Sequence, residues 1–206
     1  MTNDMTLADV VADCWRRLGL GAADAASPFR FPVLATHGLA QAGAPIPAAR
    51  TVVLRAVDPA RRELVLHTDR RAMKAAEITA APRVTLVFHD PVDRVQLRVV
   101  ANASLHSDDS RAAAAWAACS PSSRLLYRAR RGPGATIDGP FDWDEGDCDE
   151  GARPDGEGPD NAGRENFTAI VCAPLSLDWL ELCDPTHRRA VFQWAGEQFM
   201  GRWVVP

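Results

Sequence analysis

Basic side chains gather at the ends of two short apolar runs in the first half of the chain. Arg50 opens one run and Arg55 lies inside it, while Arg71 and Lys74 follow the end of the second run at Thr68. If the two runs pair as a hairpin, Arg50 and Thr68 lie near the same end, and Arg71 and Lys74 share one face of a following helix. A phosphate group requires positive charge and hydrogen-bond donors of this kind. The cluster therefore indicates a phosphate site, with solvated surface charges as the alternative interpretation.

Other kinds of site are not indicated. The sequence contains no G-x-G-x-x-G and no Walker loop, so neither a dinucleotide-binding fold nor a P-loop is expected. The five cysteines are widely spaced and form no C-x-x-C pair, which argues against a zinc site and a disulfide framework, and we expect no metal. The five histidines suggest no Ser-His-Asp arrangement. His187 is a candidate either for proton transfer or for a hydrogen-bonded structural role.

The elements that would position these side chains are mainly short strands. Apolar residues at helical spacing predict a helix over 5–19, and the Ala, Met, Lys and Glu content of 70–80 favours another. Further helical stretches are expected over 111–119 and around 122–130. Strands are predicted at residues 31–35, 51–57, 63–68, 83–89, 94–105, 167–172, 175–182, 189–194 and 199–204. This pattern predicts a mainly β fold, a β-barrel with flanking helices, rather than alternating βαβ units.

Length and charge narrow the classes of protein that this sequence fits. A chain of 206 residues with 47% apolar residues is expected to form a single domain over 1–206. The net charge of −4 and the absence of a long apolar run give no reason to expect a nucleic-acid or membrane partner. The N-terminus is acidic and amphipathic and does not resemble a signal peptide, so the cytoplasm is the expected compartment.

Residues 138–166 differ in composition from the rest of the chain. They hold eleven acidic residues and two arginines, a charge of −9 within a total of −4, so the remainder of the chain carries +5. The segment is rich in Gly, Asp and Pro, which is typical of a solvated and mobile loop. A calcium loop is the alternative, but Gly146 and Arg153 stand where such a loop needs ligands.

Five segments, in order along the chain, resemble motifs of the pyridoxamine 5'-phosphate oxidase-related family of FMN-binding proteins. Residues 50–55 resemble its R-x-V-x-L-K strand, and residues 67–78 resemble its Y-T-x-x-x-S-R-K-A-x-x-L/I element. Residues 94–99 resemble its R-Q-V-R-I strand, residues 120–124 its R-P-x-x-S-Q helix start, and residues 187–206 its H-D-R-x-x-Y and W-x-x-x-x-L-x-P ending. The resemblance implies an antiparallel Greek-key fold, the FMN-binding split barrel.

The resemblance also implies a homodimer with FMN in the groove between the subunits. Arg50 and Lys74 would hold the FMN phosphate, Thr68 would donate a hydroxyl, and Arg71 would assist. Gln96 and Arg189 would reach the flavin from the partner subunit, where a cation near the ring stabilises its reduced form. The implied cofactor residues are Arg50, Thr51, Val52, Val53, Leu54, Arg55, His67, Thr68, Arg71, Lys74, Gln96 and Arg189, with the backbone of 52–54 along the isoalloxazine.

The positions for the substrate depart from the family's pattern. Ser123 and His187 are retained as candidate substrate-binding residues, whereas Ala115, Cys119 and Pro185 replace a tyrosine and two arginines. Two cofactor positions also differ, with Met73 in place of an arginine and Arg55 in place of a lysine. We therefore expect FMN to bind and pyridoxamine 5'-phosphate to turn over poorly.

Two hypotheses about function follow. The first is an FMN-dependent oxidoreductase that takes a hydride from a small amine, alcohol or reduced cofactor and returns the electrons to oxygen. The second is a protein that holds FMN, or another planar cofactor, without turnover. A yellow protein that is bleached by an electron donor and recoloured by air would favour the first.

Overall fold

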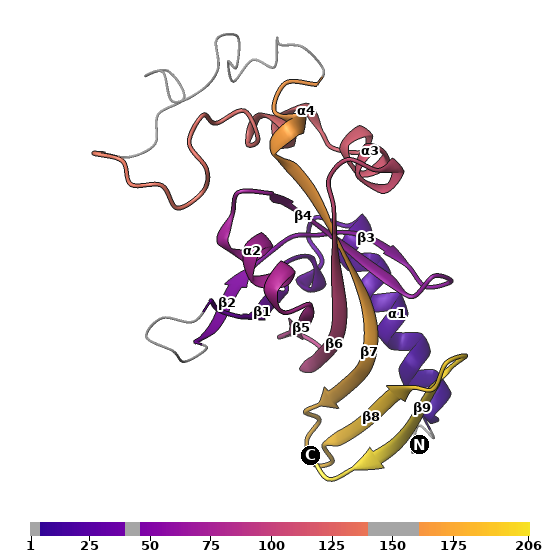
Figure 1. Cartoon of the computed structure of the whole chain (residues 1–206). Helices are drawn as coiled ribbons and strands as arrows, with labels where there is room; N and C mark the ends of the chain where they lie inside the picture. The colour runs from indigo at the N-terminus through magenta and orange to yellow at the C-terminus, as the bar shows by residue number, and fades with distance from the viewer. Residues whose placement is uncertain (1–4, 40–45, 140–160) are drawn as a thin grey trace.

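The computed structural model describes residues 5–39, 46–139 and 161–206, and in these ranges nine strands form one sheet with helices along its margins (Figure 1). The helices are α1 (Leu7–Ala23), α2 (Met73–Ala80), α3 (Ser110–Ala117) and α4 (Pro121–Leu125), with 3-10 turns η1 (Pro28–Arg30) and η2 (Arg164–Asn166). The strands are β1 (Val33–His37), β2 (Pro47–Thr51), β3 (Leu54–Asp58), β4 (Glu63–Asp69), β5 (Arg83–Asp90), β6 (Val95–His106), β7 (Phe167–Glu181), β8 (Arg188–Trp194) and β9 (Phe199–Val204).

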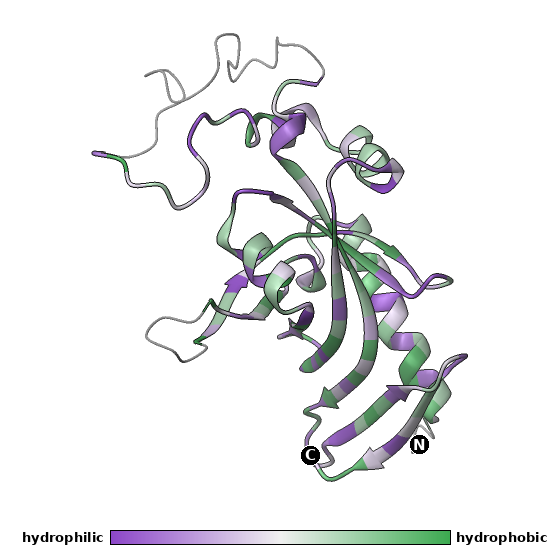
Figure 2. Cartoon of the chain, viewed as in Figure 1, coloured by the Kyte–Doolittle hydropathy of each residue, from purple (hydrophilic) through white to green (hydrophobic). Residues whose placement is uncertain are grey.

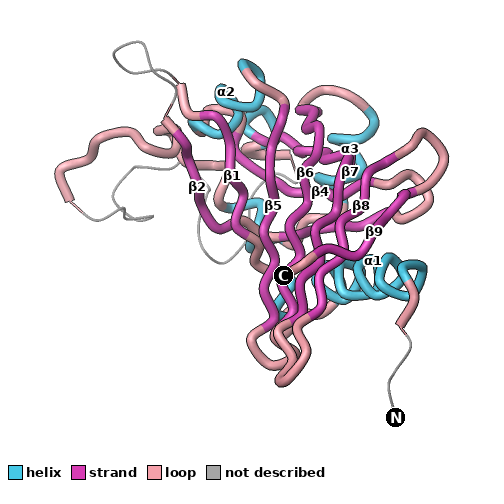
Figure 3. The backbone as a smooth tube through the Cα atoms, turned by 90° about the horizontal axis from the view of Figure 1, so that it is seen from below, coloured by secondary structure: helices cyan, strands magenta, loops and turns pink. Residues whose placement is uncertain are grey.

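All strand pairs in the described sheet are antiparallel. The main path runs β2-β1-β5-β6-β7-β4-β3, and β8 pairs with β7 and β9 beside it. The long β6–β7 pair joins the part of the molecule that carries α3 and α4 to the part that carries the β8–β9 hairpin (Figure 1). Seen from below, α1 lies beside β9 (Figure 3). The predicted mainly β, antiparallel fold with flanking helices is what the structure contains.

Alternation along β6 shows why these residues form a strand with one buried face. Val95, Leu97 and Val99 are fully buried, whereas Gln96 and Arg98 between them are exposed. The same alternation appears as bands of green and purple along β6 in Figure 2. Because side chains of successive residues point to opposite faces of a sheet, the first set enters the core and the second forms an outward face.

The apolar run 51–57 is not one strand, so that prediction was wrong. Thr51 ends β2, which pairs with β1, and Leu54 begins β3, which pairs with β4. Val52 and Val53 lie between them outside any strand, and Val52 N donates to the carbonyl oxygen of Pro32 at 2.9 Å. The chain thus changes partner strands within two residues, and this two-residue link joins the two ends of the seven-strand path.

The two strands predicted at 167–172 and 175–182 are one strand, β7. Pro174, which cannot donate a backbone hydrogen bond, lies between the two predicted segments. Instead, the register against β6 shifts at this point, where Ala101 pairs with Pro174 and Val100 with Ser176. Proline is tolerated in a sheet at such an irregularity.

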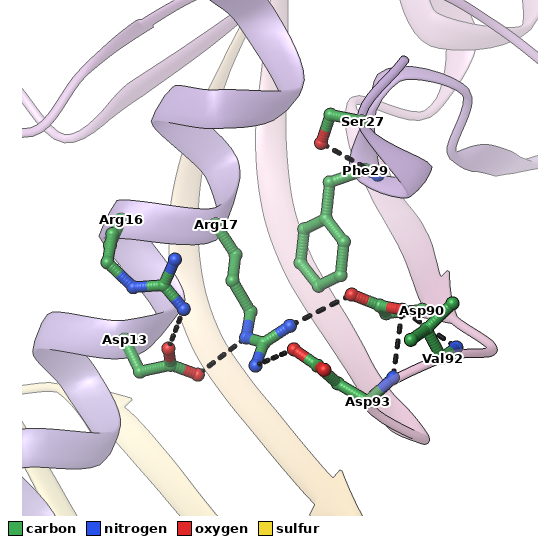
Figure 4. Close-up of polar contacts among 8 residues, drawn as sticks. All are labelled: Asp13, Arg16, Arg17, Ser27, Phe29, Asp90, Val92 and Asp93. Atoms are coloured by element: carbon green, nitrogen blue, oxygen red, sulfur yellow. Dashed lines mark hydrogen bonds and ion pairs between the residues drawn. The ribbon is translucent and has the colours of Figure 1, made fainter. Parts of the chain in front are cut away.

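Helix α1 is tied to the β5–β6 turn by one arginine (Figure 4). The Arg17 guanidinium donates from Nε to Asp13 at 2.7 Å, from Nη1 to Asp90 at 3.0 Å and from Nη2 to Asp93 at 2.8 Å. Asp90 also accepts from the backbone N–H groups of Val92 and Asp93, so it shapes the turn as well. Thr6 and Asp9 form a capping box at the start of the helix.

Most of the acidic segment, residues 140–160, lies outside the described residues, and the loop predicted there stays a prediction. In the described ranges, no helix combines the length and the apolar character that crossing a membrane requires.

Candidate functional site

The structure brings Arg50, Thr68 and Lys74 together at the end of β4. Lys74, the second residue of α2, points its Nζ to the Thr68 hydroxyl at 3.2 Å. Burial, and then the positive charge of Arg50, lower the pKa of Lys74, while Asp69 and Glu77 oppose this shift. Two cations and a hydroxyl from three separate elements therefore lie within electrostatic range of one another.

Glu77, one turn along α2 from Lys74, completes this cluster and was not among the predicted residues. It is 3% exposed and accepts from Arg50 Nη2 at 2.7 Å and from the Thr36 hydroxyl at 2.6 Å. Arg50 Nη1 donates to the same Thr36 hydroxyl at 2.5 Å. The three-residue spacing of Lys74 and Glu77 was visible in the sequence, but the burial of the carboxylate was not. Glu77 holds the Arg50 guanidinium at the cluster and supplies a counter-charge.

The donor set of this cluster fits a phosphate monoester. It offers two cations and the Thr68 hydroxyl against the carboxylate of Glu77, while Asp69, the other carboxylate that acts on Lys74, is paired with Arg71, so a net positive charge remains for an anion. Lys74 is also the single lysine among the 23 basic residues of the chain, the others being arginines. The compact ammonium group of a lysine can contact a phosphate as a point charge. An arginine at position 74 would place a second guanidinium group, which is larger, beside that of Arg50.

Arg71 does not join this cluster on a shared helix face, as the i, i+3 spacing predicted, because α2 begins only at Met73. Its guanidinium binds the carboxylate of Asp69, at 3.0 Å from Nε and 2.7 Å from Nη2. It also donates to the carbonyl oxygens of Ala129 and Arg130. Arg71 thus fastens the end of β4 to the chain that follows α4.

A cavity of about 530 Å³ lies on the other face of β4, beneath α3. His67 and Arg55, both predicted cofactor residues, line it, and the neighbouring Thr68 belongs to the cluster described above. The Nε of Arg55 is buried and has no hydrogen-bond partner in the described residues. The other lining residues are Ala22, Arg30, Ala56, Arg61, Glu63, Val65, Arg111, Ala114, Ala115, Ala118, Cys119, Ser120, Ala169 and Val171.

His67 and Cys119 meet inside this cavity, with Nδ1 and Sγ 3.4 Å apart. Burial, followed by the positive charge of Arg55, lowers the pKa of His67 to about 4. Burial also raises the pKa of the Cys119 thiol. At neutral pH the pair is therefore an uncharged imidazole beside a protonated thiol, and it adds no charge to the cavity.

The lowered pKa of His67 predicts a loss of stability in acid. Between about pH 6.5 and 4 the unfolded chain binds a proton at His67 that the folded chain does not, so the free energy of unfolding should fall as pH falls through this window. A shift of this size corresponds to on the order of 3 kcal/mol. Urea unfolding of the parent and of His67→Gln at pH 7 and pH 4 measures it. The difference in free energy of unfolding between parent and variant should change by most of this amount from pH 7 to pH 4. The same pH dependence in both proteins would contradict the assignment.

Gln96 and Arg189 lie on the outward face of the sheet. Gln96 of β6, Leu180 of β7 and Arg189 of β8 occupy one row across the three strands. The Arg189 guanidinium binds Asp178 through two hydrogen bonds of 2.9 Å. These residues are remote in sequence from the Arg50 cluster and share a single surface with each other.

Ser123 and His187 lie apart within one chain. Ser123 belongs to α4 and accepts a hydrogen bond from the Ser120 hydroxyl at 2.9 Å. His187 is exposed and follows the far end of β7, whose 15 residues begin near α4 (Figure 1). A site that used both residues would need two copies of the chain.

The fold and this arrangement define a class of protein, the antiparallel split barrels. A crystal structure of a pyridoxamine 5'-phosphate oxidase-related, FMN-binding protein from Nostoc punctiforme PCC 73102 aligns over 98% of this chain and all of that chain, with a TM-score of 0.75 and 23% identity. PhzG from Burkholderia lata 383, solved with tetrahydrophenazine-1-carboxylic acid, aligns over 96% of this chain and 91% of that chain, with a TM-score of 0.67 and 15% identity. The predicted split-barrel fold is confirmed.

Residues 14–107 match the family model described as pyridoxamine 5'-phosphate oxidase, FMN-binding domain. The resemblance predicted from the sequence motifs is thereby confirmed over this stretch. It contains Arg50, Thr68, Lys74 and Gln96, whereas Arg189 lies beyond it. A search of curated proteins found no match.

Proposed function

We propose that this protein binds FMN, with the flavin phosphate at Arg50, Thr68 and Lys74, and works as an FMN-dependent oxidoreductase. The observation that carries the proposal is the convergence of two cations and a hydroxyl from β2, β4 and α2 on one point. The FMN-binding family model covers all three residues. The link Val52–Val53 begins two residues after Arg50, so a flavin held there by its phosphate would extend along the backbone of 52–54.

Bound FMN would supply the redox chemistry, accepting a hydride from a substrate and passing two electrons to oxygen. The residues of this chain would bind and orient it. Lys74 and Arg50 would neutralise the phosphate, and Glu77 would hold the Arg50 fork in place. The neutral His67 and the Arg55 guanidinium would face the substrate side, in the cavity beneath α3.

We further propose that the flavin site is shared by two copies of the chain. The row that contains Gln96 and Arg189 lies on an outward sheet face with half-buried apolar neighbours such as Leu180 and Val191. An isologous C2 interface on this face would give two equivalent sites.

A protein that holds FMN without turnover is the second candidate. The observation that favours it is the loss of donors at the substrate positions, where Ala115 and Cys119 line the cavity and Pro185 lies in the β7–β8 loop. None of these three residues can hold a phosphate, so we expect pyridoxamine 5'-phosphate to turn over below about 1 s⁻¹, the low end for enzymes. An absorbance spectrum during reduction by a donor and reoxidation by air distinguishes the two candidates.

Replacing Lys74 by alanine should weaken FMN binding about tenfold to a hundredfold, because a hydrogen bond to a charged group contributes roughly 1.5–3 kcal/mol. The variant should purify folded, by circular dichroism, but largely colourless. Arg70→Ala is the matched control, since Arg70 is a neighbouring exposed cation whose guanidinium lies 3.8 Å from Asp108. Equal FMN affinity in Lys74→Ala and the parent would contradict the phosphate assignment.

The shared site predicts that cofactor and assembly are linked. FMN-loaded protein should be a dimer at micromolar concentration, and removal of FMN should lower the melting temperature, because a ligand that bridges two subunits stabilises the dimer by mass action. Light scattering and thermal unfolding, with and without FMN, measure both. A monomer mass for the FMN-loaded protein would exclude the roles proposed for Gln96 and Arg189.

A further inference from the structure

The cavity beneath α3 has an apolar floor made of small side chains. Val65 of β4 and Val171 of β7 are paired strand neighbours and line it, and Ala114, Ala115 and Ala118 line it from α3 and its C-terminal end. Small residues on a sheet and a helix leave a slot rather than a deep hole. Its volume of about 530 Å³ lies in the range of roughly 300–1,000 Å³ that small-molecule sites occupy.

The walls of the cavity carry positive charge. Arg30, Arg55, Arg61 and Arg111 line it against one carboxylate, Glu63. Arg111 donates to Glu63 at 2.9 Å, and Arg30 donates through Nη1 to the carbonyl oxygen of Ala22 at 2.7 Å. Arg55 differs from these, because it has neither an ion pair nor a hydrogen bond to any described residue and its Nε is buried. Arg55 as a whole is partly exposed to the cavity, and a buried guanidinium nitrogen without an acceptor favours an anion beside it.

We propose that this cavity binds a planar, apolar molecule that carries one carboxylate, with the carboxylate on Arg55 and the apolar body between α3 and the sheet. The inference rests on the proposed function, since it names the substrate class of the flavin site. Arg55 lines the cavity and directly follows residues 52–54, so a molecule in the slot lies next to the backbone along which we propose the flavin.

Two features favour a carboxylate over a phosphate. The edge of a guanidinium group offers two parallel donors that match the two oxygens of a carboxylate. A phosphate dianion needs more donors, and the other arginines of the lining already have partners: Arg30 the carbonyl oxygen of Ala22, Arg61 the carboxylate of Asp58 and Arg111 that of Glu63. Glu63, moreover, would repel a dianion more strongly than a monoanion.

The test uses FMN-loaded protein and three probes of similar shape: 2-naphthoate, 2-naphthamide and 2-naphthyl phosphate. Isothermal titration should show 2-naphthoate binding about tenfold to a hundredfold more tightly than the neutral amide, the range for one charged hydrogen-bonded contact. It should also bind at least about tenfold more tightly than the phosphate. In Arg55→Met, the affinities for 2-naphthoate and 2-naphthamide should lie within about threefold of each other. This ratio of affinities does not depend on the FMN content of the variant.

A matched pair of alanines on α3 separates filling of the cavity from general damage. Ala114 lines the cavity and Ala113 does not, although both are exposed on the same helix. Ala114→Leu should weaken 2-naphthoate binding at least about tenfold, and Ala113→Leu should leave it within about twofold.

Failure of this inference is distinguishable from failure of the proposed function. If FMN binds but 2-naphthoate does not, or binds no better than the amide or the phosphate, the substrate class is wrong and the cofactor proposal stands. Equal binding by the Ala113→Leu and Ala114→Leu variants would place the probe outside the cavity and overturn the inference. If the protein does not bind FMN, the proposed function fails, and the cavity is not a flavin substrate site.

Discussion

Replacing Glu77 by glutamine should lower the free energy of unfolding of FMN-free protein by about 3 kcal/mol, because removal of one partner from a buried ion pair leaves an uncompensated charge. The Glu77 side chain is 4% exposed and that of Arg50 is 24% exposed, so water screens the pair little. Without the carboxylate, Arg50 and Lys74 would repel each other across the Thr68 hydroxyl. At roughly 2–4 °C per kcal/mol for a chain of this size, the melting temperature should fall by about 6–12 °C.

Part of this loss should return when FMN is added. The flavin phosphate would replace the missing carboxylate as counter-charge for both cations, so FMN should raise the melting temperature of Glu77→Gln by more than that of the parent. Glu197→Gln, at an exposed position in the β8–β9 turn, is the control and should match the parent. An FMN-induced shift smaller than in the parent would mean that Glu77 acts mainly by orienting Arg50.

Replacing Arg17 by methionine should have an effect of similar size on stability but none on the cofactor cluster. The variant leaves Asp13 and Asp90, whose side chains are 15% and 11% exposed, without their shared cation. We expect a loss of about 3 kcal/mol, the lower end for a broken buried pair, because Asp93 is half exposed. Chemical denaturation measures it.

The neighbouring Arg16→Met is the matched control. Among the described residues, Arg16 forms an ion pair only with Asp13, and its side chain is 55% exposed, so this pair should contribute about 0–1 kcal/mol. FMN affinity should be unchanged in both variants, since the Arg17 network does not contact the Arg50 cluster in the described residues. Equal stability of the two variants would show that α1 is held by apolar packing rather than by Arg17.

The sequence predicted the fold class and the meeting of Lys74 with Thr68, because both depend on local patterns. Alternation placed Thr68 at the end of a strand, and composition placed Lys74 in the next helix. Arg50 also reached the cluster as predicted, but on β2, paired with β1, rather than in a hairpin with β4. Which distant strand a run pairs with depends on tertiary packing that no short window contains.

Side-chain partners were less predictable than elements. Spacing suggested that Arg71 would join Lys74, yet the carboxylate of Asp69, two residues away, binds its guanidinium. The helix of Arg17 was expected, but its partners Asp90 and Asp93 lie more than seventy residues further along the chain. The burial of Glu77 likewise follows from the packing of α2 against β1 and β6.

The link Val52–Val53 gives the sheet a mechanical property. Because β2 and β3 stand at opposite ends of the seven-strand path and are joined by two residues, the opening between them is bounded by covalent chain. The step from Thr51 to Leu54 spans at most about 11 Å, so the two edges cannot drift far apart there even when their hydrogen bonds fray. A molecule packed along these residues would restrain both edges at once. The temperature at which the sheet opens between β2 and β3 would then depend on whether the molecule is bound.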